Sequence, residues 1–339
     1  MQMITKVIKL QLEADLHTFL ALDGQSRICN WLYNHLLEKV NALKTEFIQT
    51  GNKELVNTLY TERGLRNIVP DLKKERPFLK SVHSSPIKNA ALRLSASIQA
   101  YQKSKKGKRK GKQTGWPCFR SWSAHWFSLL YDEPNKGFKI ENGILRLSLG
   151  LGEENKRRSL QLRIKDGHLL NHHTIRNMRI VKQLGIYYAV FTVQVEEAVK
   201  KPIKKIIALD PNHKNLAYGV DTSGASIEIT APFFLKAYDK RLDELKSKRD
   251  HCKRKAHLRQ VVNQEGHATG NDYWESSKRW QKYNKYLERL QHKRREQTKT
   301  FIYTAAHRLY KNYDCVGIGD YTPNGEGINT QMRRAMNKR

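Results

Sequence analysis

Two aspartates, Asp210 and Asp320, are candidate metal ligands, because each comes at or just after the end of a short apolar run. Asp210 follows the run 206–209, and we expect the strand to end there because Pro211 cannot donate a strand hydrogen bond. Asp320 follows the run 315–318 after one intervening glycine. Carboxylates on rigid strand ends suit Mg²⁺, and paired ions of this kind can hydrolyse a phosphodiester. A solvated aspartate that opens a β-turn is an equally open interpretation of Asp210.

The other candidates around these acids are weaker. Two catalytic ions need several carboxylates, but Glu326 lies in a glycine-rich segment and nothing in the sequence fixes Asp221 near Asp210. Lys214, in the turn after Asp210, could offset charge on a phosphate or could be a solvated turn lysine. The expected cofactor is Mg²⁺, with Mn²⁺ possible. Zinc is not expected, because the four cysteines are scattered and form no C-x-x-C pair.

The charge of the chain indicates a nucleic-acid partner. Lys and Arg number 63 against 32 Asp and Glu, which gives a formal net charge of +31. An excess this large, spread over the whole sequence, attracts polyanions. No apolar run approaches the ~18 residues of a membrane span, so we expect no membrane partner. With a polyanion as the expected partner, we expect no small-molecule substrate. The N-terminus lacks the long apolar segment of a signal peptide, which predicts a cytoplasmic location.

A basic low-complexity segment at 103–112 is the clearest candidate for phosphate contact. The residues expected to touch phosphates are Lys105, Lys106, Lys108, Arg109, Lys110 and Lys112, with Arg120 a few positions later. A solvated linker is the competing interpretation of this segment. Five aromatic residues follow it, and they could stack on unpaired bases or belong to a core: Trp116, Phe119, Trp122, Trp126 and Phe127.

Hydrophobic periodicity divides the N-terminal part of the chain into one strand, a helical block and a strand-rich part. Alternation predicts the first strand at 4–12. Stripes at helical spacing predict helices at 27–47, 54–66 and 85–102. Alternating runs between turn signals such as 141–143 and 165–167 then predict strands at 126–131, 137–141, 144–149, 159–164, 174–183 and 186–195. This order indicates a β-barrel interrupted by a helical lobe.

The C-terminal part of the chain predicts strands around a long helical hairpin. The expected strands are 206–209, 218–221, 226–229 and 315–318. The expected hairpin has arms at 234–262 and 272–310 and a bend at 264–270. Its second arm has a heptad-like packing seam of Trp280, Tyr283, Leu287 and Leu290. The many Lys and Arg residues of the hairpin could also line a nucleic-acid duplex.

Several of these segments resemble the TnpB family, the RNA-guided nucleases of bacterial insertion sequences, and the related compact type V CRISPR effectors. The stretch 210–217, D-P-N-H-K-N-L-A, is similar to the family's first nuclease motif, D-x-G-x-x-x-x-A, with Asn212 in place of the glycine. The stretch 115–121, G-W-P-C-F-R-S, is similar to the family's G-x-P-x-F-K-S stretch. The helical block resembles the family's recognition lobe, and the segment 107–115 resembles its basic linker.

The resemblance implies a multidomain α+β fold: a wedge-like β-barrel interrupted by a helical recognition lobe, followed by an RNase H-like (RuvC) domain with an inserted hairpin. The implied ranges are 1–14 for the first wedge strand, 15–106 for the lobe, 107–200 for linker and wedge, and 201–339 for an incomplete RuvC-like domain with its hairpin at 234–312. In an RNase H-like sheet the strands before Asp210 and Asp320 lie parallel and side by side. Both acids would then meet as metal ligands and catalytic residues.

Two departures from the family pattern bear on activity. The second nuclease motif in the family is commonly an apolar residue followed by E-D-L, whereas Ile318 is followed here by Gly319, Asp320 and Tyr321. Glycine therefore stands where the glutamate would be. Family members also continue into a Cys-rich zinc ribbon and a third acidic motif, and neither is present in these 339 residues. Either the protein is a truncated form or its remaining part lies outside this sequence, and we expect these 339 residues alone to cleave weakly or not at all.

Three functions follow as hypotheses. The leading one is an RNA-guided DNA endonuclease of the bacterial cytoplasm, associated with the nucleoid, with a guide RNA and double-stranded target DNA as partners. Guide pairing would supply specificity, while the protein reads a short flanking motif and the duplex backbone. The second is a nuclease-deficient or truncated RNA-guided DNA-binding protein, which Gly319 favours. The third is a DNA transposase, although neither a His-hydrophobic-His motif nor a tyrosine nucleophile context is visible.

Overall fold

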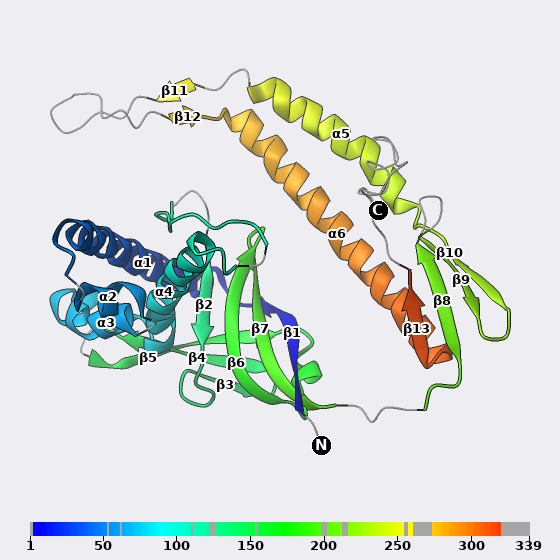
Figure 1. Ribbon diagram of the computed structural model, residues 1–339, viewed down its shortest axis with the longest axis horizontal. Coiled ribbons are helices and arrows are strands. Elements are labelled where there is room, and N and C mark those ends of the chain that lie inside the picture. Colours follow the sequence, from blue (N-terminus) through cyan, green and yellow to red (C-terminus); the bar gives the residue numbers. More distant parts are fainter. Residues whose placement is uncertain are drawn as a thin grey trace. The chain divides into compact units, whose positions relative to one another are not determined.

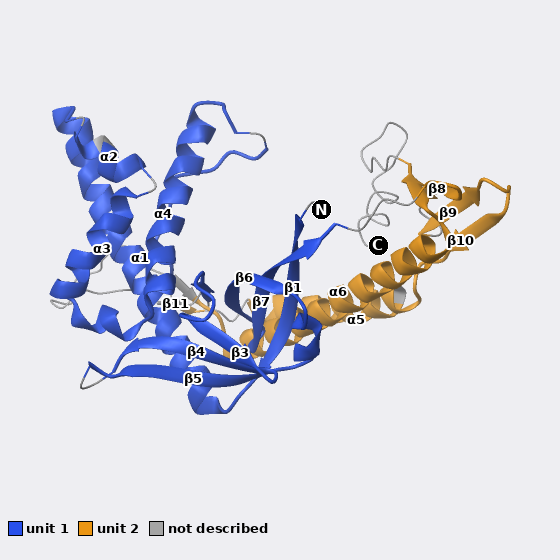
Figure 2. Cartoon of the chain, turned by 90° about the horizontal axis from the view of Figure 1, so that it is seen from below, with its two compact units in different colours: residues 1–198 blue, residues 199–339 orange. Residues whose placement is uncertain are grey.

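The chain forms two compact units, residues 1–198 and residues 199–339 (Figure 2). The computed structural model describes residues 3–52, 54–61, 63–109, 111–121, 126–152, 155–197, 202–211, 216–253, 257–259 and 273–319. The first unit holds the helical block and the strand-rich part, and the second holds the sheet with Asp210 and the helical hairpin (Figure 1). Mixed helix and sheet, as the sequence predicts, is therefore the class of both units.

Seven strands of unit 1 form one curled antiparallel sheet, in the order β2-β6-β7-β1-β5-β4-β3. Their bounds are Met3–Glu13 (β1), Ser128–Tyr131 (β2), Phe138–Glu141 (β3), Ile144–Leu151 (β4), Arg157–Ile164 (β5), Thr174–Gln183 (β6) and Ile186–Glu196 (β7). β1 lies in the middle, because most of it pairs with β7 while Leu12 and Glu13 pair with β5. Within the described residues β2 and β3 are the two edge strands and do not pair with each other, so the predicted barrel is an open half-barrel.

The turns between these strands follow local sequence chemistry. Asn142 and Gly143 both adopt positive φ, 51° and 74°, between β3 and β4. This is the two-residue hairpin turn that an Asn-Gly pair favours. Asp166 also has a positive φ, 59°, in the turn predicted at 165–167. All six strands predicted after residue 115 are present, with ends that differ by a few residues.

The helical block consists of α1 (Leu16–Thr50), α2 (Glu54–Tyr60), α3 (Gly64–Glu75), a 3-10 turn (Pro77–Ser81) and α4 (Ser84–Lys105). The start predicted for α1, residue 27, is wrong. The helix begins at Leu16 because the Asp15 carboxylate accepts a hydrogen bond from the Thr18 backbone N–H at 2.6 Å and caps it. The single helix predicted at 54–66 is also wrong, since α2 and α3 are separate there.

The helices and strands of unit 1 share one hydrophobic core. Leu36 of α1, Leu94 of α4, Leu145 of β4 and Phe191 of β7 are all fully buried members of it. Each such side chain stabilises the fold by roughly 1.5–3 kcal/mol on burial. At Gly150 of β4 the two layers meet through backbone, because a Cβ there would lie 2.0 Å from the carbonyl oxygen of Lys80. The helical block and the sheet therefore fold as one body.

Unit 2 contains a four-stranded sheet in the order β10-β9-β8-β13. The bounds are Ile206–Pro211 (β8), Ala217–Asp221 (β9), Ser226–Ile229 (β10) and Cys315–Ile318 (β13). β8, β9 and β10 are antiparallel neighbours, whereas β13 runs parallel to β8. One face is covered by α6, where Ile207 and Leu209 pack with Leu309 and Tyr313.

The helical hairpin of unit 2 consists of α5 (Phe234–Lys253) and α6 (Lys278–Asn312), which lie side by side (Figure 1). Leu287 of the predicted seam is 3% exposed, and Arg294 pairs with Asp239 of α5 at 3.0 Å. The predicted arms are too long, because β11 (His257–Arg259) and β12 (Tyr273–Glu275) pair as strands beyond the helix ends. The bend at 264–270 lies outside the described residues. In the part of the chain described, no helix is both long and apolar enough to cross a membrane.

Candidate functional site

Asp210 lies exposed at the carboxyl end of β8, as the sequence predicts. The parallel register pairs Ile318 of β13 with Leu209 of β8, which places Gly319 beside Asp210. The predicted side-by-side arrangement of these two strands is therefore confirmed. Asp320 comes one residue later, but Asp320, Lys214 and Glu326 lie outside the described residues.

Gly319 is bonded into the sheet edge and leaves room beside the carboxylate. Its backbone N–H donates a hydrogen bond to the carbonyl oxygen of Leu209 at 2.9 Å. A Cβ at this position would meet Asp210 Oδ1 at 3.8 Å and the Leu209 oxygen at 3.5 Å, which are ordinary contact distances. A side chain longer than glycine would thus point to the space next to Asp210 without a clash.

The donor set near this edge suits a hard cation. Carboxylate oxygen is the ligand that Mg²⁺ prefers, and Mg²⁺ is commonly held by one or two carboxylates together with waters and phosphate oxygens. Zinc sites instead need Cys or His ligands. Among the described residues no group of three or more His, Cys, Asp or Glu side chains could hold a metal ion. Asp210 therefore fits a Mg²⁺ site and not a zinc site, provided that a further oxygen ligand joins it.

A second acid, Glu228, shares the exposed face of the sheet with Asp210. Asp210 pairs with Tyr218 of β9, and Tyr218 pairs with Glu228 of β10. Two strand spacings separate the two acids, roughly 9–10 Å, which is too far for both to bind one ion. Tyr218, 45% exposed, lies between them on this face.

Asp221, considered in the sequence as a substitute ligand, has a structural role at the other end of β9. Its Oδ1 accepts hydrogen bonds from the backbone N–H groups of Ser223 and Ala225 and from the Ser223 hydroxyl. The Tyr313 hydroxyl donates to Oδ2 at 3.3 Å. The bonds from Ser223 hold the pKa of Asp221 below its ordinary value. Asp221 pairs with Ile207 on the opposite face from Asp210, so it closes a turn and is no metal ligand at this edge.

The basic segment continues directly from α4. Lys105 is the last residue of the helix, and Gly107, with φ 65°, ends it in the left-handed conformation. The Lys108 N–H donates to the Lys103 carbonyl at 2.9 Å, which completes a C-terminal capping motif. The described members of the segment, Lys105, Lys106, Lys108, Arg109 and Lys112, are all exposed, whereas Lys110 lies outside the described residues. Their side chains are therefore accessible from solvent, and that of Arg109 donates a hydrogen bond to the Thr114 hydroxyl.

Arg120 has a different environment from the basic segment. Its guanidinium is stacked between the rings of Tyr33 and Trp126, 3.4 Å and 3.5 Å from their centroids, and donates to the Asn30 side chain. Asn34 bonds both the N–H and the carbonyl of Arg120, at 2.8 Å and 2.9 Å. Burial lowers the pKa of Arg120 to about 10. These contacts hold the segment around Arg120 against α1. The guanidinium, predicted from the sequence to touch phosphate, is instead in contact with side chains of the protein itself.

Replacing Arg120 by alanine should lower the free energy of unfolding by about 1–3 kcal/mol, because a desolvated cation between two rings is lost. Arg120→Lys should recover only part of this loss, since an ammonium group lacks the planar stacking surface. Urea unfolding measures both, with Arg146→Ala in β4, whose side chain is exposed, as the control. Unchanged stability together with weaker nucleic-acid binding would instead support the role predicted from the sequence.

Most of the aromatic residues near Arg120 pack inside unit 1. The Trp116 indole N–H donates to Asn41 at 2.9 Å, and Phe127 meets Tyr187 edge to face. Phe119 differs, because its side chain is 58% exposed although Trp116 and Arg120 on either side of it are hydrogen-bonded to α1. Trp122 lies outside the described residues. Sequence reasoning missed Asn30, Asn34 and Asn41, which hold this segment from one side of α1 and are spaced at helical intervals.

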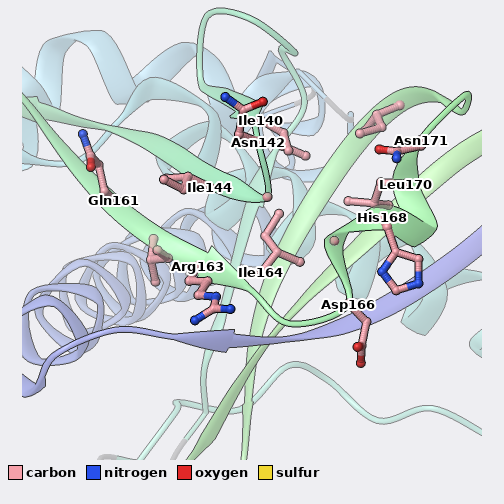
Figure 3. A pocket seen from close by; sticks show the side chains of 14 residues that line it. Ile140, Asn142, Ile144, Gln161, Arg163, Ile164, Asp166, His168, Leu170 and Asn171 are labelled. Carbon is pink, nitrogen blue, oxygen red and sulfur yellow. The ribbon is translucent and has the colours of Figure 1, made fainter.

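Unit 1 also contains an open cavity of about 970 Å³ (Figure 3). It is lined by strands β3, β4 and β5 and by the turn that carries Asp166 and His168. Asp166 is the single acid among its described lining residues. None of the residues predicted to bind metal or phosphate lines this cavity, so it supplies no part of the predicted site.

Comparison with known proteins does not assign the chain to a family. No protein-family model matches the chain, and no curated protein matches it. The cryo-EM structure of the Cas12f1–sgRNA–target DNA complex is similar with a TM-score of 0.43 at 9% identity, covering 98% of this chain and 86% of that chain. The cryo-EM structure of a CRISPR–Cas12f ternary complex is similar with a TM-score of 0.33 at 11% identity, covering 96% of this chain and 72% of that one.

Proposed function

We propose that this chain is an RNA-guided DNA-binding protein of the nuclease kind, similar to TnpB and the compact type V effectors. Its partners would be a guide RNA and double-stranded target DNA. The observation that carries the proposal is the parallel pairing of β8 with β13, which brings Asp210 and Gly319 to one sheet edge. The net charge of +31 supports a polyanionic partner. The strand order β10-β9-β8-β13 supports an RNase H-like sheet.

At the sheet edge, Asp210 and Asp320 would hold Mg²⁺, with Mn²⁺ as a substitute. A bound ion of this kind activates water and stabilises the leaving oxygen of a phosphodiester. Asp210 contributes a carboxylate fixed by the ladder of β8, and Gly319 leaves the adjacent space open to a phosphate oxygen. The exposed cations after α4 contribute phosphate contacts that are independent of base sequence.

A second candidate function is RNA-guided binding without cleavage. The observation that favours it is Gly319, because the position beside Asp210 carries no side chain, and among the described residues no three His, Cys, Asp or Glu side chains gather to hold a metal ion. One carboxylate leaves a catalytic ion with an incomplete set of fixed ligands. On this interpretation the chain would bind matched DNA and leave it uncut.

The test is to purify the chain from cells that express it with nucleic acid retained, and to sequence any bound RNA. We expect RNA of discrete length, and binding of DNA that matches it in the presence of Mg²⁺. Cleavage by this chain should be absent or very slow, and Asp210→Asn should abolish whatever remains while binding stays within about threefold.

The outcomes separate the two candidates. RNA of random length, or none, would overturn guided binding. Efficient cleavage that Asp210→Asn abolishes would reject the binding-only candidate. Efficient cleavage that survives Asp210→Asn would show that another acid forms the site.

A further inference from the structure

The outer surface of α6 carries five cations in one row. They follow one another at steps of three or four residues, the spacing of neighbours along one side of a helix. All five are exposed: Lys278, Lys282, Lys285, Arg289 and Lys293. We call this row the α6 stripe.

The stripe faces away from α5. Among the residues of α6 on the side of α5 are Leu287, which is buried, and Arg294, which pairs with Asp239. At 100° per residue these two lie on the side of the helix roughly opposite the stripe. The stripe is therefore an outer face, free of the hairpin's own packing.

The charges of the stripe are not neutralised within the described part of the chain. None of the five cations takes part in an ion pair or side-chain hydrogen bond there, and the nearby Glu288 accepts a hydrogen bond from Asn284. Like charges three or four residues apart repel and destabilise a helix. An extended anion along the stripe would remove that cost, whereas water and salt only reduce it.

We infer that the α6 stripe docks along the phosphate backbone of a nucleic-acid duplex. The five residues span about 22 Å of helix, at steps of roughly 4.5–6 Å. One strand of a duplex presents a phosphate about every 3.4 Å along the duplex axis. Neighbouring cations of the stripe would therefore lie one or two phosphates apart. This inference rests on the proposed function only in taking nucleic acid as the partner.

Two exposed tyrosines follow on α6 toward its C-terminus, and the first of them also lines a pocket shared with Leu235 and Leu242 of α5. Tyr303 and Tyr310 are 64% and 66% exposed, and Lys299 lies over the Tyr303 ring at 5.6 Å. Tyrosine hydroxyls donate hydrogen bonds to phosphate oxygens, and backbone contacts of this type position a protein without reading sequence.

The test compares two variants of the full chain that lose the same charge. The stripe variant replaces Lys278, Lys282, Lys285, Arg289 and Lys293 by glutamine. The scattered variant replaces five exposed cations of unit 1 that do not form a row, Lys6, Arg66, Lys80, Lys136 and Lys165. Binding to a DNA duplex, an RNA duplex and an RNA–DNA hybrid is measured between about 50 and 300 mM salt, with polyglutamate as a non-nucleic polyanion.

Each lost phosphate contact should make the slope of log K against log salt shallower by roughly 0.9, so for at least one duplex we expect the stripe variant's slope to be shallower by about 3–4. Its Kd for that duplex should rise about 50-fold or more at 150 mM salt. The scattered variant should change the slope by less than about 1. The duplex with the largest difference identifies the ligand. Single changes Lys285→Gln and Arg289→Gln, each expected to lower the slope by roughly 0.9, serve if the fivefold variant fails to fold.

Equal slopes for the stripe and scattered variants would overturn the inference while leaving the proposed function in place. A wild-type chain that binds no nucleic acid would overturn both. A stripe effect confined to polyglutamate would show that the surface binds an acidic protein instead.

Discussion

Replacing Gly319 by aspartate should raise the affinity of the Asp210 edge for Mn²⁺ by about tenfold or more. The new Cβ would lie 3.8 Å from Asp210 Oδ1 and clear of backbone clashes, so two carboxylates would face one ion. Affinity for such cations increases with the number of charged ligands. Without metal the two carboxylates repel, which should lower the melting temperature in EDTA and widen the shift on adding Mn²⁺. Calorimetric titration and thermal unfolding measure both effects.

Gly317→Asp is the matched control for this variant. It adds the same carboxylate to the same strand and face, but beside Ala208 instead of Asp210. The nearest atom to a Cβ there is the Ile207 oxygen at 3.8 Å, so the substitution is equally well accommodated. Asp210→Asn combined with Gly319→Asp should return the affinity to that of the original chain. Equal gains from Gly317→Asp and Gly319→Asp would show that Asp210 is not a ligand.

Replacing Lys105, Lys106, Lys108, Arg109 and Lys112 by glutamine should raise the Kd for RNA about 100-fold at 150 mM salt. These side chains are exposed on a segment whose backbone is fixed by the cap of α4. Each lost contact to single-stranded RNA should lower the salt slope by about 0.7, so a loss of roughly 3 is expected. The loss should be similar for unrelated RNA sequences, because phosphate contacts carry no base information.

The scattered variant controls for net charge in this experiment too, because it also removes four lysines and one arginine. Circular dichroism should show the helix content of the segment variant unchanged, since four of its five positions lie beyond the last helical residue of α4. An unchanged salt slope would mean that the segment does not touch phosphate.

The sheet-forming parts of this chain were predictable because their patterns are local. The Asn142–Gly143 turn follows from the tolerance of both residues for positive φ. The parallel pairing of β8 and β13 was expected from two apolar runs that each precede an aspartate, combined with the resemblance to an RNase H-like sheet. Once these two strands pair with Ile318 beside Leu209, the next residue, Gly319, must lie beside Asp210.

The features that were missed depend on residues far apart in sequence. Arg120 stands near a basic segment, which suggests phosphate contact, yet its partners Asn34 and Asn30 lie 86 and 90 residues away. No local sequence pattern predicts the stacking of Arg120 between the rings of Tyr33 and Trp126. At the hairpin tip the helical pattern was extended too far, because Tyr273 and Trp274 favour a strand once a partner strand is available.

The central position of β1 has a consequence for how the chain is made. Both neighbours of this strand, β5 and β7, are synthesised much later, and β7 ends only at Glu196. At about 5–20 residues per second, the ribosome needs on the order of 10–40 s to complete that partner. During this interval β1 is an unpaired strand, which is prone to aggregation. We therefore expect newly made chains to depend on holding chaperones, or on early collapse of α1 and α4 around Leu10 and Leu12, until the seventh strand emerges.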